Sequence, residues 1–258
     1  MNEGKLVYEK TGNIGRIVFD NPTALNALTA QMWSDLGSVC REIAKDKSVR
    51  VVTLRGAGHK AFLSGTDIGG FLKFASGRDG VAYEGRMDEY IGTVETLPQP
   101  TLAIVEGWAV GGGLALSCAS DFRIATPSAR FGSPLGRTIG NCLSAKGYAR
   151  VLAHVGVAQA KRMLLLGEMI SAEEMMNLGL LHSVVEPEAI DDAAEALCAK
   201  LAAQAPLTVK ASKEAMRRLS YRALPDMDDL IEMVYGSDDF KNGVRNFLEK
   251  KKTDWTGS

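Results

Sequence analysis

The pattern of apolar and polar residues predicts both strands and helices in the first half of the chain. The segments KLVYEK and IGRIVFD predict strands over residues 5–10 and 14–20, joined by the turn TGN. Continuous apolar runs predict further strands in VRVVTLRG (49–56) and PTLAIVEG (100–107), and DFRIATPSARFG (121–132) predicts another strand with its turn. Helical spacing from Met32 to Ile43 predicts a helix that Thr29 can cap, and a second helix is expected around residues 80–97. Residues 57–71 are expected to form a loop.

From about residue 143 the pattern becomes almost wholly helical. Helices are predicted over residues 158–168, 171–180, 188–205, 206–220 and 238–252, with one short strand in HSVVE at 182–186. Alternating strands and helices followed by helices favour an α/β core over residues 1–195 and a helical C-terminal region over residues 196–258. Periodicity alone does not distinguish this arrangement from a doubly wound sheet.

Composition and charge are those of an ordinary globular protein. Of the 258 residues, 46% are hydrophobic and 24% are charged, and the formal net charge is -1. No whole-molecule attraction to nucleic acid or to an anionic membrane is therefore expected. Four cysteines without C-x-x-C spacing favour reduced thiols, and neither an export signal nor a run of about 18 apolar residues is found. We expect a cytoplasmic protein.

Three consecutive glycines, Gly111–Gly113, stand between the apolar segment TLAIV and the small-residue segment LALSCAS. They match neither a dinucleotide fingerprint nor a P-loop, and the chain lacks H-E-x-x-H, Cys/His ligand spacing and G-x-S-x-G, so no metal site is expected. Glycines at the start of a helix leave backbone N–H groups open to close approach by a ligand. Such groups stabilise a developing oxyanion when a second donor converges on the same point. A tight turn packed under another helix is the structural alternative.

A resemblance to a known family indicates which backbone N–H group is the second donor. The segments NPTALNAL, HKAFLSGTDIGGF, VEGWAVGGGLALSCASDFRIA, FGSPLG, MLLLGEMISAEEMMNLGLLHSVV and FLEKKKTDWTG occur in this order. Together they resemble the crotonase superfamily, the enoyl-CoA hydratase/isomerase group. The resemblance implies a spiral of ββα units with C-terminal helices that mediate trimerisation. It also implies that the backbone N–H groups of Thr66 and Gly112 form an oxyanion hole for a thioester carbonyl.

The same resemblance implies the substrate and its contacts. Coenzyme A is expected only as part of an acyl-CoA substrate, with no separate cofactor, and the protein is expected to be a homotrimer or a dimer of trimers. The basic tail Lys250–Lys252 and the Lys60 region are expected near the coenzyme phosphates, where His59 is a further candidate. Substrate contacts are expected from Ala24, Leu25, Lys60, Ser64, Asp67, Ile68, Trp108, Gly111, Pro134 and Leu135.

Two departures from the family pattern concern proton transfer. Typical hydratases of the family carry glutamates where this chain has Ala115 and Leu135. Each general acid–base group contributes roughly 10²–10⁴ to a rate, so we expect a poor hydratase of simple enoyl-CoA substrates. Loop GRTIGNCLSAK offers Asn141 and Ser144 as polar pocket residues, with Cys142 as a nucleophile only if its pKa is lowered. Capping, core packing or solvation are the alternatives for these residues and for Arg137 and Lys146.

Three functions remain open at this stage. The first is a lyase or isomerase of the enoyl-CoA hydratase/isomerase family that acts on an unusual acyl chain through an enolate. The second is a thioester hydrolase, decarboxylase or C–C lyase of the same superfamily. The third is an acyl-CoA binding protein without chemistry.

Overall fold

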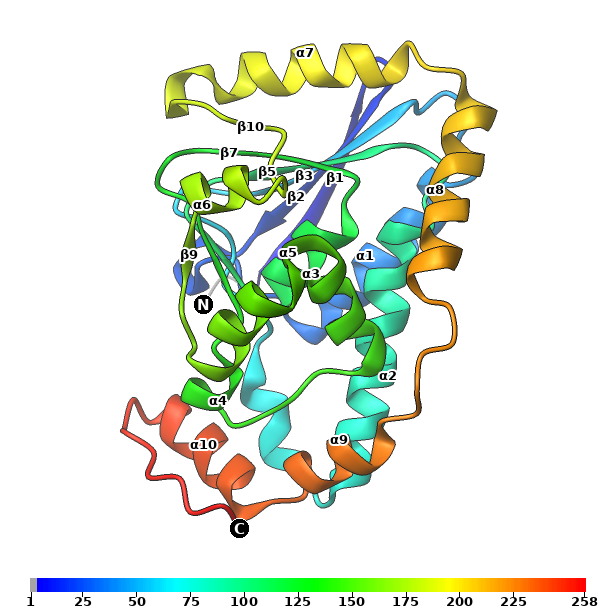
Figure 1. The fold of residues 1–258 in the computed structure, drawn as a ribbon. Helices are drawn as coiled ribbons and strands as arrows, with labels where there is room; N and C mark the ends of the chain where they lie inside the picture. The colour runs from blue at the N-terminus through cyan, green and yellow to red at the C-terminus, as the bar shows by residue number, and fades with distance from the viewer. Residues whose placement is uncertain (1–3) are drawn as a thin grey trace.

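Two β-sheets form the centre of the molecule (Figure 1). The structure, a computed structural model, describes residues 4–258. The larger sheet is parallel except for its first pair, β1 with β2. Its strands, in spatial order, are β1 (Lys5–Thr11), β2 (Ile14–Asp20), β3 (Val51–Gly56), β5 (Thr101–Val105), β7 (Phe122–Ala125) and β10 (Ser183–Val184). The smaller sheet contains β4 (Ala61–Leu63), β6 (Trp108–Val110), β8 (Arg130–Gly132) and β9 (Ile170–Ser171).

Successive strands are shared between the two sheets in a repeating way. In the pairs β3–β4, β5–β6 and β7–β8, the first strand joins the larger sheet and the second joins the smaller one. A helix follows each pair: α2 (Gly77–Glu95), α3 (Gly112–Ala119) and α4 (Leu135–Thr138). This repetition is the predicted spiral of ββα units, and it distinguishes the fold from a doubly wound sheet.

Short sequence signals fix the first two long helices. Helix α1 (Ala30–Ile43) begins where the Thr29 side chain accepts a hydrogen bond from the Met32 N–H, as predicted. Helix α2 begins with a reciprocal capping box between Ser76 and Asp79. The apolar faces of both helices pack on the main core, which includes Trp33, Leu36, Ile91 and Val94.

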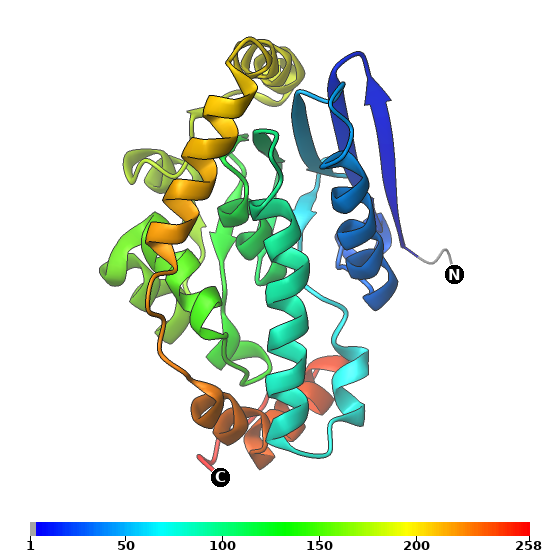
Figure 2. The ribbon, with the colours of Figure 1, turned by 90° about the vertical axis from the view of Figure 1, so that its right-hand side faces the viewer.

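The helical part of the chain wraps around the spiral and returns to α2 (Figure 2). It comprises α5 (Ala145–Leu165, kinked at Gly156), α6 (Ala172–Asn177), α7 (Ile190–Ala202), α8 (Pro206–Ser220), α9 (Asp228–Tyr235) and α10 (Asp238–Leu248). Helix α9 packs against α2, and α10 packs against the 3-10 helix η2 (Ile68–Lys73). Two further 3-10 helices are η1 (Pro22–Ala24) and η3 (Pro187–Ala189).

The last helices share a hydrophobic cluster with the core segment. This cluster joins Phe71 and Ile139 to Tyr235, Phe240 and Val244. The expected boundary between residues 195 and 196 falls inside α7. Helices α9 and α10 therefore pack directly against segments of the α/β core.

Several short elements were not expected from the sequence. The predicted loop over residues 57–71 contains β4 and the start of η2, and the glycine run follows β6 rather than β5 directly. Strand β9 and helix α9 were also missed. Strands of two or three residues are too short to show a period, so they depend on pairing with neighbours for their identity. Within residues 4–258, no helix is long and apolar enough to cross a membrane.

Candidate active site

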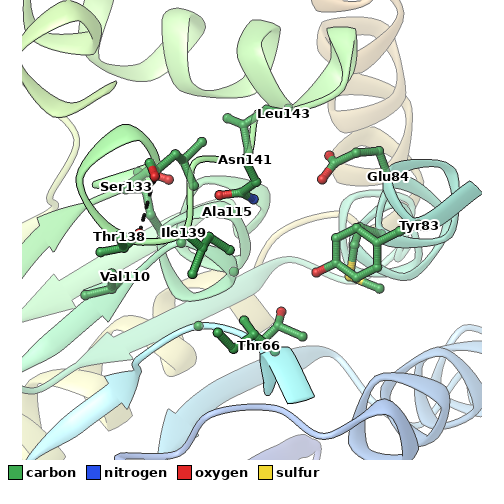
Figure 3. A pocket seen from close by; sticks show the side chains of 18 of the residues that line it. Thr66, Tyr83, Glu84, Val110, Ala115, Ser133, Thr138, Ile139, Asn141 and Leu143 are labelled. Carbon is green, nitrogen blue, oxygen red and sulfur yellow. Dashed lines mark hydrogen bonds between the residues drawn. The ribbon is translucent and has the colours of Figure 1, made fainter. Parts of the chain in front are cut away.

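A cavity of about 250 Å³ lies between α2, α3, the segment before η2 and the loop that leads into α5. Helix α10 contributes Phe247 to its lining. Most of the lining is apolar, and polar groups are confined to a few positions (Figure 3). An apolar cavity with few convergent polar groups is typical of a small-molecule site. The apolar side chains include Ile68, Met87, Ile91, Val110, Leu114, Leu135, Ile139, Leu143 and Val151.

Each of the three glycines has different surroundings. Gly111 has φ 53, a left-handed conformation that side chains disfavour. A Cβ on Gly113 would lie 2.3 Å from the Leu63 carbonyl oxygen, so only glycine lets α3 approach β4 this closely. A Cβ on Gly112 would lie 3.4 Å from Thr66 Oγ1, which places Gly112 and Thr66 side by side in the cavity wall.

The backbone N–H groups of Thr66 and Gly112 are both free of backbone partners in the structure of residues 4–258. Around Thr66, the carbonyl of Gly65 and the N–H of Asp67 both bond to Leu28. Alternation along an extended segment therefore turns the Thr66 N–H away from Leu28. Gly112 is the first residue of α3, and the first N–H groups of a helix have no partner within it.

A buried tryptophan fixes the Thr66 side chain. The indole Nε1 of Trp33 donates a hydrogen bond to Thr66 Oγ1 at 3.2 Å, and Trp33 itself is fully buried and stacks on Tyr90. Figure 3 shows the Tyr83 ring extending from α2 into the cavity that Thr66 also lines. Burial raises the pKa of the Tyr83 hydroxyl, so that group stays protonated. The neighbourhood of the two N–H groups is thus rigid and rich in donors.

Ala115 and Leu135 both line the cavity. Neither side chain carries a titratable proton or a hydrogen-bond acceptor. The wall formed by α3 and α4 therefore offers no acid or base at these two positions.

The opposite wall carries a carboxyl that the sequence analysis missed. Glu84 on α2 is buried, with 6% of its surface exposed, and it lines the cavity. Its Oε2 accepts the Ser144 N–H at 3.0 Å, and its Oε1 accepts the Tyr235 hydroxyl at 2.6 Å. Burial raises the pKa of Glu84 to about 7, although both hydrogen bonds act in the opposite direction.

The pattern on α2 held a signal for this carboxyl. Gly80, Glu84, Ile91 and Val94 are buried along the helix, so Glu84 occupies a position on the apolar face. A charged residue in an apolar stripe is unusual unless it is paired or functional. The neighbouring carboxyls on this helix are the half-buried Asp88 and the exposed Glu89.

Asn141 lies next to this carboxyl and is only partly satisfied. Its Nδ2 donates to the Tyr235 hydroxyl at 3.3 Å, and its Oδ1 is buried without a hydrogen-bond partner among the described residues. Asn141 also lines the cavity. The structure therefore places Asn141 in the pocket, as expected, and directs its amino group to the hydroxyl that contacts Glu84.

Asp88 lines the same wall one turn after Glu84. Burial raises the pKa of Asp88, while a side-chain hydrogen bond with Ser144 and the charges of Arg150 and Lys146 lower it in part. Arg150 is buried and is already paired with Glu95, with Nε and Oε1 2.6 Å apart.

Two of the loop residues have structural roles. Ser144 lines the cavity, but its hydroxyl caps α5 by accepting the Gly147 N–H at 2.9 Å. Cys142 is not activated as a nucleophile, since burial raises the pKa of its thiol to about 12. The side chains of Arg137 and Lys146 are exposed.

The remaining predicted contacts divide into lining and outer residues. Ser64, Ile68, Gly111, Pro134 and Leu135 line the cavity. Ala24 and Leu25 are exposed and lie beside it, because the Ser64 hydroxyl donates to the Ala24 carbonyl and the Ser64 N–H donates to that of Leu25.

Four outer residues are not part of the lining. Trp108 is 42% exposed and is not among the residues that line the cavity. Lys60 is exposed, and the Asp67 carboxylate accepts the Gly69 N–H, which orders the start of η2. His59 Nδ1 lies 2.9 Å from Glu106 Oε1 and also contacts Arg55. The His59 ring therefore has hydrogen-bond partners within the protein.

Comparisons with known proteins identify the family. The profile of the Enoyl-CoA hydratase/isomerase family matches residues 9–258, and the chain belongs to this family, within the crotonase superfamily. The chain is 32% identical to a short-chain-enoyl-CoA hydratase of Clostridium acetobutylicum, over 98% of this chain and 97% of that protein. It is 34% identical to an (E)-benzylidenesuccinyl-CoA hydratase of Thauera aromatica, over 81% of each.

Solved structures show the same fold. A methylmalonyl-CoA decarboxylase in complex with 2-nitronate-propionyl-CoA is similar with a TM-score of 0.89 and 25% identity, over 98% of this chain and 99% of that one. An enoyl-CoA hydratase/carnithine racemase from Magnetospirillum magneticum is similar with a TM-score of 0.80 and 32% identity, over 98% and 96%. No cluster of potential metal-binding side chains occurs among residues 4–258.

Proposed function

We propose that this protein is an enzyme that converts acyl-CoA thioesters through an enolate whose oxygen is held by the N–H groups of Thr66 and Gly112. The observation that carries the proposal is the pair of partner-free N–H groups side by side in one wall of an apolar cavity. Two preorganised donors at one point stabilise the negative charge that develops on a thioester oxygen. The names of the relatives, which are acyl-CoA hydratases and a decarboxylase, support the same substrate class.

Hydration or isomerisation of an unusual acyl chain is the first reaction we propose. The cavity wall at Ala115 and Leu135 lacks proton carriers, so crotonyl-CoA should be hydrated poorly. The acyl part would lie among the apolar side chains, and the coenzyme would leave the cavity past Ser64 and the Ala24–Leu25 loop towards Lys60 and the Lys250–Lys252 tail.

Decarboxylation is the second candidate, favoured by the likeness to methylmalonyl-CoA decarboxylase. Breaking a C–C bond to release CO₂ leaves its electron pair in the enolate, so no base is required at Ala115 or Leu135. An apolar wall also favours loss of a carboxylate that it solvates poorly. A panel of crotonyl-CoA and methylmalonyl-CoA, with products identified by mass spectrometry and free thiol measured for hydrolysis, separates these reactions.

The test of the N–H pair uses two substitutions at one position. Gly112→Pro removes the N–H, and proline is tolerated at the first residue of a helix. Gly112→Ala keeps the N–H while adding a Cβ 3.1 Å from Trp33, and it is the matched control. We expect Gly112→Pro to lower turnover roughly 10²–10³-fold relative to Gly112→Ala, with melting curves for both. Equal turnover in the two variants would contradict the proposal, and thioester binding without any turnover would favour an acyl-CoA binding protein.

We also propose a trimer or a dimer of trimers as the working assembly. Helix α8 has no buried residue in the single chain, and Leu207 and Leu219 are 80% and 73% exposed. Large apolar side chains gathered on one helix are typical of an interaction surface. A stable monomer by light scattering at micromolar concentration would contradict this assembly.

A further inference from the structure

We propose that Glu84 is the catalytic acid–base of this protein, which takes a proton from Cα of the bound thioester and returns it, and that Tyr235 and Asn141 position its carboxyl. This inference rests on the proposed function. It assigns the proton carrier to α2 instead of the glycine-rich wall.

Geometry restricts the choice of proton carrier. Among the carboxyls that line the cavity, Glu84 is the buried one, and donors from two other elements fix both of its oxygens. Each carboxylate oxygen accepts about two hydrogen bonds, so one acceptor site on each remains for the cavity. Figure 3 shows the carboxyl of Glu84 directed into the space that Asn141 and Ala115 border. Asp88 is only half-buried and lies closer to solvent, and its side-chain hydrogen bond is with Ser144 alone.

The contacts of Glu84 form a directed chain. Asn141 Nδ2 donates to Tyr235, the Tyr235 hydroxyl donates to Glu84 Oε1, and the Ser144 N–H donates to Oε2. A carboxylate accepts both of its bonds without rearrangement, so this arrangement is built for the charged form. Burial works against that charge, and the two effects leave the pKa of Glu84 at about 7. A general acid–base is most effective when its pKa lies close to the working pH.

The proton balance of the step is closed. The Glu84 carboxylate forms an O–H bond as the Cα–H bond breaks, and the C–H electron pair becomes the Cα=C bond of the enolate. The thioester C=O π pair moves to oxygen, where the N–H groups of Thr66 and Gly112 receive it. Return of the proton to Cα regenerates the carboxylate. After decarboxylation, in which no Cα–H bond breaks, Glu84 instead passes to the enolate carbon a proton that it has taken from water. No further reactant is needed.

Exchange of the α-protons of butyryl-CoA in D₂O tests this step, because a saturated thioester reports enolate formation without a known substrate. Deuterium uptake is measured by mass spectrometry, and butyryl-CoA affinity by calorimetry. We expect Glu84→Gln to lower the exchange rate by roughly 10²–10⁴-fold with nearly unchanged affinity. Uptake by the wild-type protein should rise with pH and level off above about pH 7, because the carboxylate is the base.

Tyr235→Phe provides the second readout. This variant keeps the ring and removes the donor that lowers the pKa of Glu84, so the inflection of the exchange profile should move to higher pH. Other groups that act on this carboxyl are unchanged in the variant, namely Asp88 on α2, Cys142 in the loop, and Tyr148 and Arg150 on α5. A packing role alone would alter the melting temperature without moving the inflection.

Outcomes that contradict the assignment of Glu84 differ from outcomes that contradict the proposed function. Undiminished exchange in Glu84→Gln, or loss of exchange only in Tyr83→Phe or Asp88→Asn, would overturn the assignment of Glu84. Absence of exchange in the wild-type protein that binds butyryl-CoA would also overturn it. If exchange survives Gly112→Pro, or butyryl-CoA does not bind, the proposed function itself is wrong.

Discussion

The two walls of the cavity present different kinds of chemical group. On the α3 side, Thr66 and Gly112 present backbone N–H groups, and the neighbouring Ala115 and Leu135 are apolar. On the α2 side, the Ser144 backbone N–H and the Tyr235 hydroxyl hold the carboxyl of Glu84. The first wall presents backbone donors, and the second presents one side-chain carboxyl.

This difference teaches which properties of the site are free to change. Backbone donors persist under most substitutions, since every residue except proline carries an N–H. A proton carrier depends on one side chain and can arise wherever a carboxyl faces the cavity at a suitable pKa. Charge stabilisation and proton transfer are therefore separable here, and each wall can be altered alone.

The largest expected effect comes from giving the α3 wall the carboxyls that it lacks. In the double variant Ala115→Glu, Leu135→Glu, crotonyl-CoA hydration should rise by up to about 10⁴-fold, because two acid–base groups then face the bound thioester. Turnover and butyryl-CoA affinity are measured together, and the affinity should change little.

Desolvation limits that gain, because new carboxyls in an apolar wall have raised pKa values. Melting curves of each single variant identify any loss of stability. Efficient crotonyl-CoA hydration by the unaltered protein would contradict the contrast between the walls.

The next effect concerns stability and isolates the α2 wall. The folded pKa of Glu84, about 7, is raised from 4.5, so its favourable contribution is present below about pH 4.5 and is lost as pH rises through about 7. Relative to wild type, Glu84→Gln should gain up to about 3 kcal/mol in unfolding free energy between pH 5 and pH 9. Denaturant unfolding at both pH values measures the difference, and the exposed Glu89→Gln on the same helix is the control for removing a carboxyl. A difference that is independent of pH would show that Glu84 ionises as freely when folded as when unfolded.

The smallest effect lies outside both walls, at the cavity mouth. Lys60 is exposed and precedes β4, whose end leads to Ser64 in the lining. A charge-assisted bond to a coenzyme phosphate contributes about 1.5–3 kcal/mol, so Lys60→Ala should weaken butyryl-CoA binding roughly tenfold at low salt. S-butyryl pantetheine, which lacks the nucleotide, should be insensitive to this substitution. Equal effects of the substitution on the binding of the two ligands would contradict a contact between Lys60 and a coenzyme phosphate.

Much of the fold follows from the sequence because its signals are local. Apolar segments identified the strands at 14–20 and 49–56, and helical spacing identified the helix capped by Thr29. The three-residue strands β4, β6 and β8 carry too few positions for a period, and the smaller sheet exists through their pairing. The ββα spiral could therefore be inferred from resemblance but not from periodicity.

The site was predictable in one wall and not in the other. Gly111–Gly113 have a backbone reason that is visible in sequence, and Thr66 came from resemblance to a family motif. Glu84 depends on burial against Tyr235, a residue 151 positions away, and no local pattern specifies that contact. The shift in its pKa is likewise a property of the folded cavity rather than of α2.

The distance along the chain between these two residues also orders events during synthesis. Thr66 and Gly112 belong to the first half of the chain, whereas Tyr235 and Phe247 reach the cavity from α9 and α10. Contacts of such long separation form late, because the intervening chain must first be closed into a loop. A chain still attached to the ribosome can therefore assemble the two N–H donors while its acid–base wall is incomplete. Competence for proton transfer arrives only with the final helices, which makes it a sensitive reporter of complete folding.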